Sequence, residues 1–324
     1  MEENTEQRVD LTLFSEKIQE LKDRIACVIV GQEQTVDLVL TAILANGHVL
    51  IEGVPGVAKT LLARLTARLI DADFSRIQFT PDLMPSDVLG TTVFNMKTNG
   101  FDFHQGPIFA DIVLVDEINR APAKTQAALF EVMEERQISI DGTTHRMGDL
   151  YTILATQNPV EQEGTYKLPE AQLDRFLMKI TMDYPSLEEE VNILERHHTN
   201  AALVKLDDIT PAITKEEVLS LRAFMNQVFV DRTLLQYIAL IVLQTRTSKA
   251  VYLGASPRAS VAMLQSSKAY ALLQGRDFVT PEDIKFVAPY VLQHRLILTA
   301  EAEMEGYSPV KVTQRLIDKV EVPK

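Results

Sequence analysis

The sequence predicts an α/β protein built on a parallel, doubly wound sheet, followed by an all-helical domain. Three observations lead to this prediction. Short apolar runs alternate with helical patterns, the alternation stops near residue 185, and only helical spacing follows. Because 324 residues exceed one typical domain, we expect two domains, an α/β core with its leading helix in residues 1–195 and a helical domain in residues 205–324.

The first elements are two helices and a strand. Apolar residues at three- and four-residue steps predict an amphipathic helix over residues 11–30, Gly31 and Gln32 interrupt it, and a second helix covers about 33–45. The strand within HVLIEG is continuously apolar, as expected for a strand covered on both faces. We expect the remaining buried strands at residues 75–80, 112–117 and 151–158, with a weaker candidate at 176–182.

Two hairpin signals interrupt the alternation. Asn99 and Gly100 lie between alternating segments in TTVFNMKTNGFDFHQG, and Asp141 and Gly142 lie in QISIDGTTHRM. Asn-Gly and Asp-Gly favour the tight turns of two-stranded hairpins. A helical pattern over residues 124–136 separates the two signals, so we expect a core with an elaborated surface.

The remainder of the chain reads as helices. Ser186, Ser256 and Thr280 lie at or beside helix starts, and a proline follows both Ser256 and Thr280 at the first helical position. Residues 200–212 have the character of a linker. The helical domain therefore follows this segment.

Composition limits the function classes. The net charge of −13 argues against general affinity for nucleic acid or an anionic membrane, although it leaves a local basic patch open. Cys27 is the single cysteine, which excludes an intrachain disulfide and a cysteine metal cage. We do not expect the acidic start to act as a signal peptide. The apolar run YIALIVL is far shorter than the ~20 residues that span a bilayer. We expect a cytoplasmic protein.

The stretch VLIEGVPGVAKTLLARLTARL resembles a phosphate-binding loop between a strand and a helix. The template G-x-x-x-x-G-K-[ST] matches residues 53–60, except that Ala58 stands where the second glycine belongs. Backbone N–H groups at the start of such a helix face an anion. The expected nucleotide-binding residues are Gly53, Val54, Pro55, Gly56, Val57, Ala58, Lys59, Thr60 and Leu61.

Each of the key residues has a physical role in this interpretation. Gly53 allows a sharp exit from the strand, and Gly56 lets the backbone curl around a phosphate. Lys59 would reach the β- and γ-phosphates, and the Thr60 hydroxyl would hold Mg²⁺. The alternative is a Gly/Pro turn that happens to precede Lys-Thr. The buried strand before the loop and the helix after it favour the nucleotide site.

The run IVLVDE supplies the second half of the site. Asp116 and Glu117 follow four apolar residues, and the carboxyl ends of parallel strands are where ligands bind in such sheets. Asp116 suits the Mg²⁺ shell, and Glu117 suits the general base that orients an attacking water. Two solvated acids at a strand end are the alternative, which the phosphate loop upstream disfavours.

Together these segments resemble the AAA+ ATPases, and within them the MoxR family. The resemblance spans residues 25–298 and rests on six motifs that occur in the family's order and spacing. They are GVPGVAKT, FTPDLMPSDVLG, GPIFADIVLVDEINRAPAKTQAALFEVMEERQISIDG, ATQNP, LPEAQLDRF and GASPRA. The family tends to carry alanine before the lysine, which accounts for Ala58.

The resemblance implies three further site residues. Asn158 matches the sensor-1 position, where an amide positions water, although an asparagine after a strand is often only a turn former. Arg175 matches the arginine finger that reaches a neighbour's nucleotide, with a local salt bridge as the alternative. Arg258 matches the sensor-2 arginine of the lid, acting in cis or in trans, or it is simply a solvated helix residue.

The resemblance also implies an activity and partners. An AAA+ core with a helical lid would hydrolyse ATP with Mg²⁺ in a ring, expected to be a hexamer. It would remodel or assemble a client protein or aid its metal loading, with a von Willebrand factor A domain protein as a possible partner. The two hairpins would face the pore or a substrate, and Arg120 would line an interface or pair with Glu117 or Glu131. A nucleotide-gated binding scaffold and a DNA-linked motor remain as alternatives, the latter disfavoured by the acidic charge.

Overall fold

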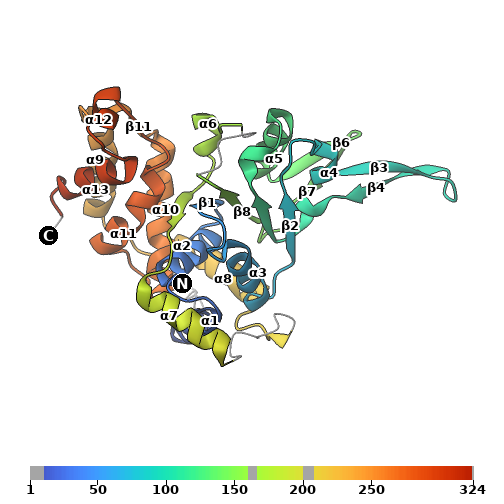
Figure 1. The fold of residues 1–324 in the computed structure, drawn as a ribbon, viewed down its shortest axis with the longest axis horizontal. Helices are drawn as coiled ribbons and strands as arrows, with labels where there is room; N and C mark the ends of the chain where they lie inside the picture. The colour runs from blue at the N-terminus through green and yellow to red at the C-terminus, as the bar shows by residue number, and fades with distance from the viewer. Residues whose placement is uncertain (1–10, 160–165, 200–207, 323–324) are drawn as a thin grey trace, which may run out of the picture.

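A computed structural model describes residues 11–159, 166–199 and 208–322 of the chain (Figure 1). Its centre is a five-stranded parallel sheet in the order β2-β5-β8-β1-β9. The strands are β1 (Val49–Gly53), β2 (Phe74–Gln78), β5 (Ile112–Asp116), β8 (Thr152–Gln157) and β9 (Met178–Met182). The sheet confirms the predicted fold class and the predicted strands.

Alternate residues of each central strand point to opposite faces of the sheet, and both faces are covered. On β5, Leu114 packs into one core cluster, while Val113 and Val115 pack into a second one. The first cluster includes residues of α1 (Leu11–Val28), α2 (Glu33–Leu44) and α3 (Lys59–Leu69), and the second includes residues of α5 (Ala123–Glu135). Burial on two faces explains why the central strands are continuously apolar.

The edge strand β2 corrects one expectation. It begins and ends earlier than the predicted segment 75–80, and only Ile77 is buried. Arg76 and Gln78 alternate with Ile77 along the strand, and their side chains are exposed. A strand at the sheet edge has one neighbour, so its side chains can remain open to solvent and to a site.

Both predicted hairpins are present. The first pairs β3 (Gly90–Asn95) with β4 (Gly100–Gln105) and projects from the body as a long arm (Figure 1). The second pairs β6 (Gln137–Ile140) with β7 (Thr143–Arg146) through a two-residue turn at Asp141 and Gly142, both with positive φ. The short elements around these hairpins are α4 (Pro85–Leu89), η1 (Pro107–Phe109) and η2 (Ile118–Arg120).

Among the residues that the structure describes, the other elements are helices apart from one short ribbon. The ribbon pairs β10 (Val251–Leu253) with β11 (Ile297–Leu298), so the expectation of an all-helical domain needs this addition. The helices are α6 (Glu170–Leu173), α7 (Leu187–His198), α8 (Lys215–Phe224), η4 (Met225–Gln227), α9 (Arg232–Thr247), α10 (Pro257–Leu273), α11 (Pro281–Leu292), α12 (Ala300–Met304) and α13 (Pro309–Asp318). Across the described ranges, no helix has the length and apolar character needed to cross a membrane.

The predicted helix starts differ in how they are capped. Ser186 and Thr280 form capping boxes with the residue three positions later. Ser256 stands at the N-cap of α10, but its hydroxyl lies 3.4 Å from a carboxylate oxygen of Asp174 in the core. The predicted linker lies partly outside the described residues, and the domain boundaries at 195 and 205 stay a prediction.

Candidate nucleotide-binding site

The loop of residues 53–60 joins β1 to α3 as the motif requires. At Gly53 an added Cβ would lie 2.8 Å from the Met182 carbonyl oxygen on β9, so the close approach of the neighbouring strand demands glycine. Gly56 has φ +90°, and nothing lies within 4 Å of an added Cβ. Glycine is therefore needed there for backbone conformation rather than for space.

Ala58, which departs from the motif, adopts the left-handed conformation with φ +60° and ψ +22°. This conformation costs an L-residue about 1–2 kcal/mol, whereas glycine adopts it freely. The alanine therefore keeps the backbone path that the missing glycine would have allowed. Because α3 begins at the next residue, Lys59, the first N–H groups of the helix face the loop.

The lysine and threonine of the motif lie at the mouth of this loop. The Lys59 ammonium donates a hydrogen bond to the Gly53 carbonyl at 2.5 Å. Together with Thr60 it lines a cavity of about 370 Å³, whose remaining walls come from Pro55, Gly56, Ala58, Leu61, Asp116, Glu117, Thr156 and Asn158. Of the other predicted loop residues, Val57 is buried in the core and Val54 packs against it.

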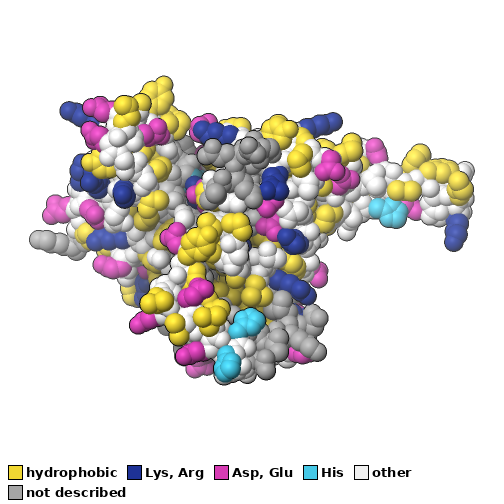
Figure 2. Space-filling view, viewed as in Figure 1, with side chains coloured by type: hydrophobic (Ala, Val, Ile, Leu, Met, Phe, Trp, Pro, Cys, Tyr) yellow, Lys and Arg dark blue, Asp and Glu magenta, His cyan; other side chains and the backbone are white. Residues whose placement is uncertain are grey.

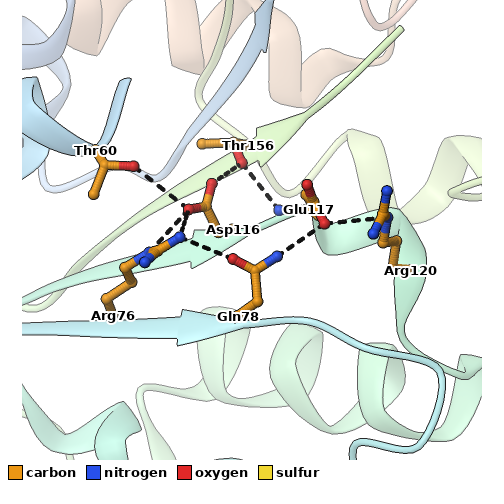
Figure 3. A network of polar contacts seen from close by, with 7 residues as sticks. All are labelled: Thr60, Arg76, Gln78, Asp116, Glu117, Arg120 and Thr156. Atoms are coloured by element: carbon orange, nitrogen blue, oxygen red, sulfur yellow. Dashed lines mark hydrogen bonds and ion pairs between the residues drawn. The ribbon is translucent and has the colours of Figure 1, made fainter. Parts of the chain in front are cut away.

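Asp116 lies across the cavity from the threonine (Figure 3). One of its carboxylate oxygens lies 3.5 Å from the Thr60 hydroxyl and accepts hydrogen bonds from Arg76 at 2.7 and 3.0 Å. Its other oxygen accepts a hydrogen bond from the Thr156 hydroxyl at 2.6 Å. Two hard oxygen donors this close fit a single Mg²⁺, whose remaining ligands would come from phosphate and water.

Glu117 leaves the strand in a left-handed conformation with φ +57°. Gln78 donates a hydrogen bond to its carboxylate at 2.8 Å, and the Arg120 guanidinium lies 3.1 Å from the same oxygen (Figure 3). The Glu117 backbone N–H donates to the Thr156 hydroxyl at 3.0 Å. Arg120 is thus the local partner of Glu117, one of the two roles that the sequence left open for it.

Sequence reasoning missed three residues of this network. Arg76, Gln78 and Thr156 hold the two acids, and Arg76 donates to Gln78 at 2.9 Å, which links the partners of both acids. The sequence carried a signal for two of them. Arg76 and Gln78 alternate with apolar Ile77, a pattern that indicates a strand with one polar face, although we interpreted this segment as a buried strand. Thr156 is hidden in an apolar strand and has no comparable signal.

Asn158 lines the same cavity and is almost fully buried. It follows β8, whose parallel neighbour β5 ends in Asp116. The structure therefore brings the phosphate loop, the two acids and the predicted sensor residue together at the carboxyl ends of three strands, as expected for a doubly wound sheet.

The two remaining predicted site residues lie elsewhere. Arg175 and Arg258 line a separate cavity of about 500 Å³ together with Glu134, Asp174 and Arg295. Arg175 pairs with Glu134 at 3.0 Å rather than with its sequence neighbour Asp174, which pairs with Arg295 at 2.6 Å. Arg258 is 59% exposed and pairs with the same Glu134 at 2.9 Å. Within one chain, neither arginine reaches the phosphate loop.

Two family models match the chain. The model of the ATPase family associated with various cellular activities (AAA) matches residues 48–178, and the AAA lid domain matches residues 243–318. The crystal structure of a candidate ATPase from Cytophaga hutchinsonii superposes with a TM-score of 0.89 at 41% identity and covers 97% of both chains. These matches agree with the α/β core and the helical C-terminal part.

Relatives known by sequence are similar over nearly the whole chain. An uncharacterized Bacillus subtilis protein, YeaC, is 48% identical over 91% of this chain and 92% of its own length. The chaperone MoxR1 of Mycobacterium tuberculosis is 44% identical over 92% of this chain and 80% of its own. The protein MoxR of Methylorubrum extorquens is 30% identical, covering 91% of both. This chain therefore belongs to the MoxR family of AAA+ ATPases.

Proposed function

We propose that the chain is a Mg²⁺-dependent ATPase whose turnover drives chaperone-like remodelling of client proteins. One observation carries the proposal: a single cavity brings Lys59, Thr60, Asp116, Glu117 and Asn158 together around the phosphate loop. Each supplies one part that phosphoryl transfer to water requires, namely phosphate binding, a metal ligand pair, a base and a polar group that positions water.

The chain's own residues would share the work of hydrolysis. Lys59 and the N–H groups at the start of α3 hold the phosphates, and Thr60 and Asp116 would hold Mg²⁺, which offsets charge on the β- and γ-phosphates. Glu117 orients the attacking water and accepts its proton. Asn158 donates to that water or to a γ-phosphate oxygen. In the structure Gln78 and Arg120 both contact Oε2 of the Glu117 carboxylate, so its Oε1 is the oxygen that would face the water.

Catalysis in a ring accounts for the position of the two arginines. Glu117 lies just before α5, and Glu134, which holds Arg175 and Arg258, lies near the other end of this 13-residue helix, about 20 Å long. A chain of this shape would present its arginines to the phosphate loop of a neighbour. We propose that both act in trans within a hexameric ring.

Exposed apolar side chains on the projecting hairpin support contact with a client protein. Val93, Phe94, Met96 and Phe101 are between 46% and 89% exposed, and hydrophobic side chains gather along this arm in Figure 2. Surface patches of this kind mark sites of interaction with other proteins. A relative is named a chaperone. We further propose that the chain assembles its client or aids the client's metal loading, and that a protein with a von Willebrand factor A domain is its partner.

Replacing the base tests hydrolysis. A Glu117→Gln variant should bind ATP with unchanged affinity, while turnover falls at least ~100-fold. Glu131→Gln, which alters an exposed acid on α5, serves as the matched control. Unchanged turnover in Glu117→Gln would remove this residue as the base. ATP binding without turnover in the wild-type chain, with or without client, would indicate a nucleotide-gated scaffold instead.

Mixing two inactive chains tests the trans arrangement. Arg175→Ala chains keep an intact phosphate loop, and Lys59→Ala chains keep an intact finger. Mixed rings should regain part of the activity, because some sites combine both intact halves. If activity in the mixture only follows dilution, the finger does not act in trans.

A further inference from the structure

One carboxylate joins arginines from two distant parts of the chain. Glu134 lies in the last turn of α5, Arg175 follows α6 in the core, and Arg258 lies in the first turn of α10. One Glu134 oxygen lies 3.0 Å from Arg175 and the other lies 2.9 Å from Arg258. Arg175 is also anchored by a hydrogen bond to the Phe130 carbonyl at 3.1 Å. The two guanidinium groups are thus held on opposite oxygens of one side chain.

The surrounding charges make Glu134 the counter-charge for this pair. Four arginines line the cavity, which are Arg136, Arg175, Arg258 and Arg295, against two acids, Glu134 and Asp174. Asp174 is already engaged by the almost fully buried Arg295. Without Glu134 the guanidinium groups of Arg175 and Arg258 would repel one another and would separate in solvent.

The contacts of Glu134 are poorly placed to stabilise the fold. Its side chain is 35% exposed, and those of Arg175 and Arg258 are 31% and 59% exposed. Ion pairs this open to solvent contribute little to stability. The buried pair of Arg295 and Asp174 already ties the helical part to the core beside the finger. The Glu134 contacts therefore point to positioning rather than to folding.

We infer that Glu134 is a positioning residue, which holds Arg175 and Arg258 side by side so that both reach the same γ-phosphate of a neighbouring subunit. This inference rests on the proposed function, in which these arginines act in trans. An arginine side chain that is not held in position contributes less to the rate of hydrolysis, because misplacement by about 1 Å can cost ~100-fold in rate. Because Glu134 contacts both the core arginine and the lid arginine, one side chain sets the spacing between them.

Glu134→Gln tests the inference, since it keeps the shape and removes the charge. We expect the kcat for ATP hydrolysis to fall about 10- to 50-fold, with the KM for ATP within about twofold of wild type and the melting temperature nearly unchanged. Glu134→Asp keeps the charge and should restore part of the rate. Glu135→Gln, at the exposed neighbouring position, should behave as wild type.

A combined variant separates positioning from a structural effect. In an Arg175→Ala, Arg258→Ala background, Glu134→Gln should change the residual rate less than about twofold, because there is nothing left to position. An equal loss in both backgrounds would overturn the inference. So would a Glu134→Gln chain as fast as, or faster than, wild type while Arg175→Ala is slow. If Arg175→Ala and Arg258→Ala both match wild type, the proposed trans finger fails and the inference fails with it.

Discussion

Thr156 joins the two acids of the candidate site through one hydroxyl group. It donates a hydrogen bond to Asp116 at 2.6 Å and accepts one from the Glu117 backbone N–H at 3.0 Å. Its side chain is fully buried on β8, next to the strand that carries both acids. One residue of a neighbouring strand therefore sets the orientation of the metal-side acid and of the backbone that carries the base.

Thr156→Val should damage this arrangement without changing the side chain's size. The Glu117 N–H and one Asp116 oxygen lose their partner inside the protein, so we expect a loss of about 1–3 kcal/mol in the free energy of unfolding, together with slower ATP turnover. Thr156→Ser keeps the hydroxyl and should lose much less. Urea unfolding of the three chains measures the difference, and equal midpoints for Val and Ser would contradict this account.

Ala58→Gly should be neutral or stabilising, although glycine normally weakens helices. The residue has φ +60°, a conformation that glycine adopts without the cost an L-residue bears. Relief of this strain offsets the larger entropy of the unfolded chain, so we expect a change between zero and a gain of about 1 kcal/mol. Ala127→Gly, on the exposed face of α5, should instead cost about 1 kcal/mol. Thermal unfolding compares the two, and a clear loss for Ala58→Gly would argue against the left-handed conformation.

Stability should fall as the pH drops below about 6.5. Burial, followed by the charge of Arg136, lowers the pKa of His48 to about 3, and its Nδ1 accepts a hydrogen bond from the Ile153 N–H. Between these pKa values the unfolded chain binds a proton that the folded chain excludes. The free energy of unfolding therefore falls by about 1.4 kcal/mol per pH unit for this histidine. Burial also lowers the pKa of His294, which adds to the same slope.

Substitution of His48 isolates its share of this slope. Urea unfolding at pH 7.5, 6.0 and 5.0 should show that the free energy of unfolding falls less steeply with decreasing pH in His48→Gln than in wild type. The expected difference in slope corresponds to about one bound proton, or about 1.4 kcal/mol per pH unit. His104→Gln, at an exposed position of the arm, should keep the wild-type slope. A wild-type slope in His48→Gln would show that folding does not lower the pKa of this histidine.

Arg295→Met should strongly destabilise the contact between the helical part and the core. The guanidinium is 4% exposed and donates to the Asp174 carboxylate at 2.6 Å and to the Phe176 carbonyl at 2.7 Å. Removing Arg295 takes the partner from the Phe176 carbonyl and from the Asp174 carboxylate, which is 23% exposed and stays partly solvated, at a cost of about 2–4 kcal/mol. Arg232→Met, on the exposed side of α9, should change stability by less than about 0.5 kcal/mol. Equal denaturation midpoints for the two variants would contradict the role of Arg295.

Two phenylalanines on β4 should respond differently to truncation. Phe101 is 73% exposed, so Phe101→Ser should leave stability and basal ATP turnover unchanged and should weaken only client-dependent activity. Phe103, two residues along, packs on the rings of His145 and Phe109 with centroids 4.3 and 5.9 Å away. Phe103→Ser should cost about 2–3 kcal/mol. Equal unfolding midpoints for the two variants would show that the arm does not pack as described.

Much of the site was predictable because its signals are local. The phosphate loop depends on a strand, a few glycines and a helix start within a dozen residues, and Asp116 and Glu117 follow directly from an apolar run. The hairpin at Asp141 and Gly142 is equally local, since two residues with positive φ make its turn. At Asn99 and Gly100 the hairpin is present, but Gly100 lies in the strand, paired with Asn95.

The partners of these residues were not predictable in the same way. Gln78 meets Glu117 only because β2 is an edge strand in parallel register with β5, where Gln78 stands opposite Asp116. Glu134 is 41 residues from Arg175 and 124 residues from Arg258 along the chain. No residue spacing in the sequence predicts either contact.

The sequence by itself determined the alternation of strands and helices, the turn residues of the loops, and the residue types at the phosphate loop and the acidic strand end. The tertiary structure decided which strand lies at the edge, which side chains hold the acids, and that the two arginines share one carboxylate away from their own phosphate loop. The physical reason is the distance along the chain over which each kind of interaction acts. Backbone preferences and apolar periodicity act over a few residues, whereas these contacts depend on how whole strands and helices pack.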